Sequence, residues 1–167
     1  MKDSRTDVPV TTAVRFLRDK KIEFEPYLYN YVDQGGTGHA AKELHVPEHC
    51  VVKTIILQTD SGEPLVVLMH GDCDISTKEL ARVMEVKHVT QCNERDANRY
   101  TGYVVGGISP FGTKRTLRIC IQRTILSLPE IYINGGKRGF LVKINPQDIQ
   151  RAFPYTEVEV AVPRSNG

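Results

Sequence analysis

The sequence predicts a globular domain of mixed α/β class. Residues 51–59 and 64–69 are β-rich apolar runs joined by Asp60-Ser61-Gly62, which is the clearest hairpin signal in the chain. The segment Ser76-Thr77-Lys78-Glu79 is a capping box, typical of a helix start. The chain has 167 residues, of which 40% are hydrophobic, and this is enough to bury one sizeable core. Strands and helices therefore alternate around one core.

A single domain is expected to span the whole chain. No low-complexity linker divides residues 1–167, so they are assigned to one domain. Its core is expected over about residues 10–153, with residues 154–167 as a C-terminal tail that has no evident partner.

The first half of the chain is expected to supply two short helices and an edge strand. Thr11 or Thr12 can cap a helix that runs to about residue 21. Residues 22–31 alternate and are rich in tyrosine, but Pro26 restricts them to an edge strand or a bulge. Thr37 can cap a helix over residues 39–46, because the proline that follows would end it.

The second half is expected to continue the alternation. The capping box predicts a helix to about residue 85, and Asn93 can cap another to about residue 100. Asn145 can cap a last helix, to about residue 153. Strand-like runs complete the pattern, at residues 87–91, 103–105, 115–122, 131–134 and 140–144.

The stretch over residues 101–116, TGYVVGGISPFGTKRT, carries the strongest functional signal. Residues 106–110 form a turn that begins with two glycines, so backbone N–H groups can face an anion or a polarised carbonyl. A P-loop is excluded because Thr113 separates Gly112 from the lysine. A nucleophile elbow is excluded because residue 111 is Phe, so Ser109 is not supported as a nucleophile.

Lys53 interrupts an otherwise apolar strand. Its ammonium must reach water or an anion, or else Lys53 protects a sheet edge from pairing. Thr54 should point to the opposite face, so the two would share a pocket only if the strand bulges. The tyrosines of the preceding aromatic strand would share one face, either as half-buried core or as a base-stacking platform: Tyr27, Tyr29 and Tyr31.

Charge and cysteine content exclude several classes of protein. A net charge of +2 does not support binding of a long duplex through charge alone. Two local clusters could meet a few phosphates or be ordinary surface cations: Lys114, Arg115 and Arg118 after the first glycine turn, and Lys137 with Arg138 inside the second. The polar N-terminus and the lack of an apolar run of about 20 residues indicate a cytoplasmic protein without a membrane partner.

No metal or other cofactor is expected. The four cysteines contain no CxxC pair, so neither a disulfide framework nor a zinc site is indicated. His45 and His49 have the spacing of helical zinc ligands, but Pro47 lies between them. Asp72 and Asp74 match a calcium loop only weakly.

Three motifs in order, VVKT at residues 51–54, GGISP at 106–110 and GGKRG at 135–139, closely resemble those of the YbaK/EbsC family of aminoacyl-tRNA deacylases. This family is related to editing domains of prolyl-tRNA synthetase. The resemblance covers about residues 10–153 and implies a mixed β-barrel flanked by helices. It also implies a trans-editing enzyme that removes a mischarged small amino acid, foremost cysteine from Cys-tRNA(Pro). The implied partners are the 3′ end of aminoacyl-tRNA and prolyl-tRNA synthetase, with no DNA.

The resemblance also implies site residues. Lys53 matches the lysine that holds the phosphate or ribose end of the substrate, and Tyr29 and Thr54 match pocket positions. The loop that approaches the ester corresponds to Gly106, Gly107 and Ile108, with Ser109 and Pro110 beside them. The second glycine motif supplies further substrate-binding candidates, Gly135, Gly136, Lys137, Arg138 and Gly139. One position departs from the family, because Leu141 stands where Asp is common.

The central loop lacks a resident general base. Residues 101–118 contain no His, Asp or Glu, so they can supply hydrogen-bond donors but no base. The family mechanism implies that a cysteinyl substrate attacks its own ester with its thiol, whereas water or a ribose hydroxyl would serve for other amino acids. Two alternatives stay open: a non-catalytic module that binds tRNA or nucleotide, and a partner protein of the synthetase.

Overall fold

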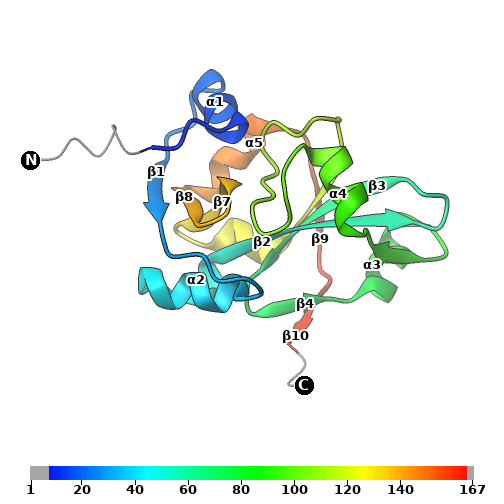
Figure 1. The fold of residues 1–167 in the computed structure, drawn as a ribbon. Helices are drawn as coiled ribbons and strands as arrows, with labels where there is room; N and C mark the ends of the chain where they lie inside the picture. Colours follow the sequence, from blue (N-terminus) through cyan, green and yellow to red (C-terminus); the bar gives the residue numbers. More distant parts are fainter. Residues whose placement is uncertain (1–7, 165–167) are drawn as a thin grey trace, which may run out of the picture.

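The computed structural model describes residues 8–164 and contains one eight-stranded mixed sheet flanked by five helices (Figure 1). The sheet has the strand order β1-β8-β7-β2-β3-β6-β9, and β5 pairs with β2 beside this path. Its strands are β1 (Glu25–Leu28), β2 (Val51–Thr59), β3 (Pro64–His70), β5 (Val89–Gln91), β6 (Arg118–Gln122), β7 (Ile131–Lys137), β8 (Phe140–Ile144) and β9 (Thr156–Val158). Strands β4 (Cys73–Ile75) and β10 (Ala161–Pro163) form a second, two-stranded sheet. The predicted mixed α/β class is confirmed.

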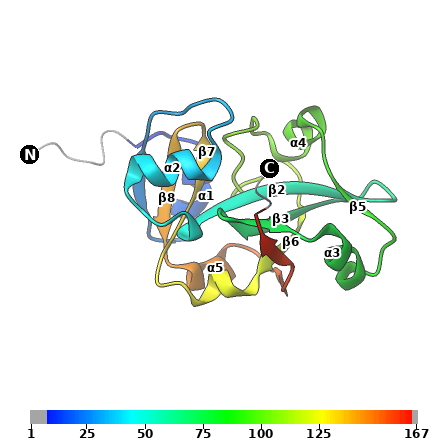
Figure 2. The same cartoon turned by 90° about the horizontal axis from the view of Figure 1, so that it is seen from below.

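The helices are short and cover different parts of the sheet (Figures 1 and 2). Three of them, α1, α4 and α5, pack on the largest core cluster, while α2 and α3 each pack on a smaller one. The α-helices are α1 (Thr12–Asp19), α2 (Gly36–Leu44), α3 (Thr77–Met84), α4 (Glu94–Thr101) and α5 (Ile149–Ala152). The 3-10 helices are η2 (Glu48–Cys50), η3 (Arg123–Ser127) and η4 (Pro146–Asp148).

The sheet curves around the largest buried cluster. Inward side chains of five strands, β2, β3, β6, β7 and β8, belong to the same buried cluster. A sheet must bend strongly for strands at its centre and near its end to share one cluster, as in the implied mixed barrel. The sheet is mixed: β2 pairs antiparallel with β3, whereas β2 with β7 and β3 with β6 are parallel pairs.

Helix starts follow the predicted capping residues, with one exception. The side-chain oxygens of Thr11, Ser76 and Asn93 accept hydrogen bonds from backbone N–H groups of the first turn, at 3.0, 3.2 and 2.8 Å. Thr37 was wrongly predicted to cap α2, whose N-cap is Gly35. The Thr37 hydroxyl instead donates to the Glu48 carboxylate at 2.8 Å.

Three other predicted elements differ from the structure. Residues 103–105 do not form a strand, because Gly102 ends α4 with a φ of +80° and the Tyr103 N–H turns back to the Thr101 hydroxyl at 3.1 Å. The final helix is split into η4 and the one-turn α5. The glycine turn after residue 134 is mostly part of β7, which carries a bulge between Asn134 and Lys137.

The expected core boundary at residue 153 is too early. Strand β9 pairs with β6, and β10 pairs with β4. Val158 and Val160 are 3% and 1% exposed and belong to a buried cluster. Among residues 8–164, no helix combines the length and the apolar character that crossing a bilayer requires.

Candidate functional site

A cavity of about 600 Å³ lies beside the middle of β2. Strand β2 pairs with β7 at Val51 and Val52 and with β5 from Leu57 onward, so residues 53–56 have only β3 as a paired strand. The cavity fills this opening in the sheet. Its walls come from the loop before α2, from β2, and from the loop around residue 106.

Thr54 presents polar groups to this opening. The Ile56 carbonyl oxygen accepts from the Cys92 N–H at 3.0 Å, so the backbone polar groups of Ile56 face away from β3. Because these directions alternate along an antiparallel strand, the N–H and C=O of Thr54 face the same way, into the opening. The Thr54 hydroxyl oxygen is buried without a hydrogen-bond partner among the described residues. An unsatisfied buried hydroxyl beside a cavity indicates a place for a polar ligand atom.

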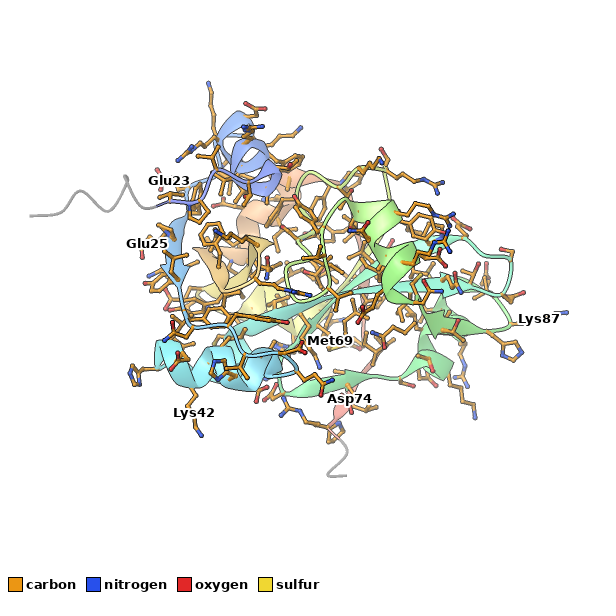
Figure 3. All side chains as sticks on the ribbon, viewed as in Figure 1. Glu23, Glu25, Lys42, Met69, Asp74 and Lys87 are labelled. Carbon is orange, nitrogen blue, oxygen red and sulfur yellow. The ribbon has the colours of Figure 1, made fainter. Side chains whose placement is uncertain are left out.

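Lys53 lies on the same stretch of β2 but points to its other face. Its ammonium donates to the Cys73 carbonyl oxygen at 2.5 Å and lies 3.9 Å from the Asp74 carboxylate, which Figure 3 labels beside β4. Burial lowers the pKa of Lys53, and Asp74 partly opposes this shift. Lys53 does not protect an outer edge of the sheet, because β2 lies between β7 and β3.

Lys53 and Thr54 line the same cavity although their side chains leave the strand on opposite faces. A strand bulge is not the reason, since the pairing of β2 with β3 is regular from residue 52 to residue 58. The cavity reaches both faces because the sheet is open beside residues 53–56.

Of the three backbone donors expected in the glycine loop, one is already used inside the protein. The Gly107 N–H donates to the Val104 carbonyl oxygen at 2.8 Å and is therefore occupied. Gly106 and Ile108 line the cavity, and within residues 8–164 their N–H groups donate no hydrogen bond. Ser109 and Pro110 are buried away from the cavity, and the Ser109 hydroxyl accepts from the Phe111 N–H at 3.2 Å.

The second glycine motif supports this loop and does not line the cavity. A Cβ atom on Gly107 would lie 2.8 Å from the Arg138 nitrogen, so the two segments are in close backbone contact. The Arg138 guanidinium donates to the Val105 carbonyl oxygen at 2.9 Å and lies 5.3 Å from the Tyr31 ring. None of the five predicted residues is part of the cavity wall: Gly135, Gly136, Lys137, Arg138 and Gly139.

The tyrosines divide between two environments. Tyr29 and Tyr31 line the cavity, and burial raises the pKa of Tyr29. Tyr27 packs edge-on against Tyr132, with ring centroids 5.3 Å apart, and is not part of the cavity wall. Leu141 also lines the cavity and is only 5% exposed, so this wall is apolar.

Sequence reasoning missed Asn134 as a wall residue and the contact that Tyr31 makes with the glycine loop. The Asn134 side chain donates to the Gly106 carbonyl oxygen at 3.1 Å and so fixes the loop. Its only sequence signal was its position before the second glycine motif. Tyr31 packs so closely on Gly106 that a Cβ there would lie 2.5 Å from the Tyr31 hydroxyl. That contact joins segments far apart in sequence, and no local pattern reports it.

Comparison with known proteins gives the same assignment as the motifs. The family model described as "Aminoacyl-tRNA editing domain" matches residues 36–152. EbsC of Enterococcus faecalis, provisionally named a Cys-tRNA(Pro)/Cys-tRNA(Cys) deacylase, is 25% identical over 83% of this chain and 85% of its own length. The proline–tRNA ligase of Brachyspira hyodysenteriae is 29% identical over 55% of this chain, a region that makes up 16% of that enzyme.

Solved structures share the fold. The hypothetical protein APE2540 superposes with a TM-score of 0.82 at 21% identity, over 90% of this chain and 99% of that one. A provisionally assigned trans-editing enzyme for prolyl tRNA synthetase superposes with a TM-score of 0.78 at 16% identity, over 93% and 99% of the two chains. The resemblance to the YbaK/EbsC deacylases is confirmed, and the chain belongs to the aminoacyl-tRNA editing domain family.

Proposed function

We propose that this protein is a trans-editing deacylase that removes cysteine from Cys-tRNA(Pro) in the cytoplasm. The observation that carries the proposal is that Thr54, Gly106 and Ile108 line one cavity, where the Thr54 hydroxyl has no partner and the N–H groups of the other two donate no hydrogen bond within residues 8–164. These groups can bind the carbonyl and the amino end of an aminoacyl ester. Family membership and the name of the Enterococcus relative support the reaction and the choice of cysteine.

The proposed chemistry uses the substrate's own nucleophile. The cysteine thiol attacks the ester carbonyl carbon, a carbon–sulfur bond forms, and the carbon–oxygen bond to the ribose breaks. The thiol proton passes to the ribose oxygen that leaves, so the products are a thiolactone and uncharged tRNA. The N–H groups of Gly106 and Ile108 stabilise the oxyanion, for which one donor is typically worth about 3 kcal/mol.

Lys53 binds the phosphate or ribose end of the tRNA. To do so, its ammonium exchanges the Cys73 carbonyl oxygen for an oxygen of the substrate. The apolar wall at Leu141 favours a side chain such as the thiol of cysteine over a strongly polar one. Because the net charge is only +2, the 3′ end is held weakly and in a salt-sensitive way, and prolyl-tRNA synthetase is the proposed recruiting partner.

The test is single-turnover loss of amino acid from tRNA-Pro charged with cysteine, alanine or proline. Wild type should release cysteine, and Lys53→Ala should slow this release at least about 100-fold, as expected when a group that positions the substrate is lost. Lys87→Ala is the matched control, because Lys87 is an exposed lysine at the far end of the molecule, pointing away from its body in Figure 3.

Other results would change the proposal in defined ways. Equal rates of release of alanine and cysteine would show that the thiol is not the nucleophile, and water or a ribose hydroxyl would take its place in the mechanism. Release that persists in Lys53→Ala would remove Lys53 from the mechanism. Retained binding of charged tRNA with no release of any of the three amino acids would favour a non-catalytic binding module.

A further inference from the structure

A cluster of three metal-ligating side chains lies outside the wall of the cavity. His49 comes from η2, Asp72 from the turn after β3, and Cys73 from the start of β4. The His49 Nδ1 atom lies 2.8 Å from the Asp72 carboxylate, and the Cys73 sulfur lies 3.6 Å from the same oxygen. All three ligand atoms lie within 4.8 Å of one another.

These separations suit a tetrahedral metal ion. Zinc bond lengths of about 2.0–2.3 Å place an oxygen and a sulfur ligand about 3.6 Å apart, and an oxygen and a nitrogen ligand about 3.4 Å apart. The Asp72–Cys73 separation already has this value, and the His49–Asp72 separation has only to widen by about 0.6 Å. Because His49 and Asp72 are 46% and 43% exposed, water can complete the coordination.

Neighbouring groups orient two of the three ligands, as outer-shell partners do in metal sites. The His49 ring stacks on the buried His70 ring, with centroids 3.7 Å apart and planes within 8°. His70 is itself held between the His49 carbonyl oxygen at 2.8 Å and the Thr124 hydroxyl at 2.7 Å. The backbone of Cys73 is fixed by the hydrogen bond from Lys53 to its carbonyl oxygen, at 2.5 Å.

We propose that His49, Asp72 and Cys73 bind a divalent transition-metal ion of the zinc class, with water in the fourth position. On binding, the Cys73 thiol releases its proton to solvent, and the hydrogen bond between His49 and Asp72 gives way to two metal–ligand bonds. The ion ties η2 to the β3–β4 turn. The proposal does not rest on the deacylase activity, although Cys73 also supplies the carbonyl oxygen that holds Lys53.

The test is titration of the metal-free full chain with Zn²⁺ by calorimetry, and with Co²⁺ by absorption spectroscopy. Wild type should bind one ion per chain and develop a thiolate-to-cobalt charge-transfer band, which should be absent in Cys73→Ser. Removing an outer-shell partner typically weakens metal binding about 10- to 100-fold, so removing a ligand in His49→Ala should weaken it at least about tenfold.

Cys50→Ser and His88→Ala are the controls, since these residues are the same types but lie outside the cluster. Both should bind as wild type does. Thermal unfolding without metal identifies any variant that fails to fold. If Cys73→Ser does not fold, metal binding by His49→Ala decides the proposal instead. The proposal is overturned by the absence of saturable binding, or by a cobalt spectrum that Cys73→Ser leaves unchanged.

Discussion

Tyr103 closes the glycine loop, because its buried hydroxyl donates to the Phe111 carbonyl oxygen at 2.5 Å. Burial raises the pKa of Tyr103 from 10.0 to about 12. The protonated form is favoured in the folded state, so this contribution to the free energy of unfolding is complete below pH 10 and is lost as pH rises towards 12. This pKa change corresponds to a loss of roughly 2–3 kcal/mol in the free energy of unfolding across that pH range.

Tyr103→Phe should therefore lower stability at neutral pH and flatten its decline with alkali. Removing one hydrogen bond costs about 1 kcal/mol near neutrality. The measurement is the urea midpoint at intervals from about pH 9 to about pH 12, where the phenol titrates. Tyr155→Phe is the control for loss of a phenol hydroxyl, since that hydroxyl makes no hydrogen bond within residues 8–164 and its removal should cost less stability at neutral pH. Parallel pH profiles for wild type and Tyr103→Phe would contradict this assignment.

At the residue scale, sequence reasoning selected several residues that the structure brings to one cavity, but not every contact. Lys53 was conspicuous because a charge in an apolar strand needs a polar partner, and the structure has it bonded to Cys73. The occupied N–H of Gly107 could not be foreseen, because it depends on the turn made by Val104. Lys53 and Thr54 share a cavity because β5 and β7 stop pairing with β2 on either side of them. No local sequence pattern encodes the ends of these pairings.

At the element scale, the end of β6 holds the last strand in place through one side chain. The side-chain oxygen Oε1 of Gln122 accepts from the N–H groups of Val160 and Ala161, at 2.9 and 3.1 Å. Gln122→Ala leaves these donors unsatisfied, which should lower the free energy of unfolding by about 1–3 kcal/mol. Urea denaturation measures the loss. Gln150→Ala, at an exposed position of α5, should cost far less, and equal losses would refute this role of Gln122.

Elements were predictable where their signal is local. The caps of α3 and α4 lie within the first turn that they stabilise, so Ser76 and Asn93 identified both helices. Apolar residues 103–105 suggested a strand, but the left-handed Gly102 and the Thr101 hydroxyl turn the chain there. Strand β9 also lacks a local signal, because it is three residues long and pairs with a strand more than 30 residues away.

At the scale of the whole molecule, the C-terminal segment completes the second core. A chain that ends after residue 153 would lack β9, β10 and the buried Val158 and Val160. We expect it to lose cooperative unfolding, because the apolar surface of β3 and β6 under these residues would be exposed. Near-ultraviolet circular dichroism during urea titration measures this, with a chain ending after residue 164 as control. If the chain that ends after residue 153 shows a sharp transition with an unchanged midpoint, residues 154–164 are not needed for the core.

The fold class was predictable because three motifs, a hairpin and two capped helices all indicated the same architecture. The opening of the sheet beside residues 53–56 was not predictable from the sequence, and it changes which groups of β2 can contact a ligand. The middle of a central strand there acts as an internal edge, whose donors and acceptors belong to the main chain. Every amino acid except proline carries the same N–H and C=O, so this part of the site persists through side-chain substitution. An alanine scan would therefore understate how much of the cavity wall β2 provides.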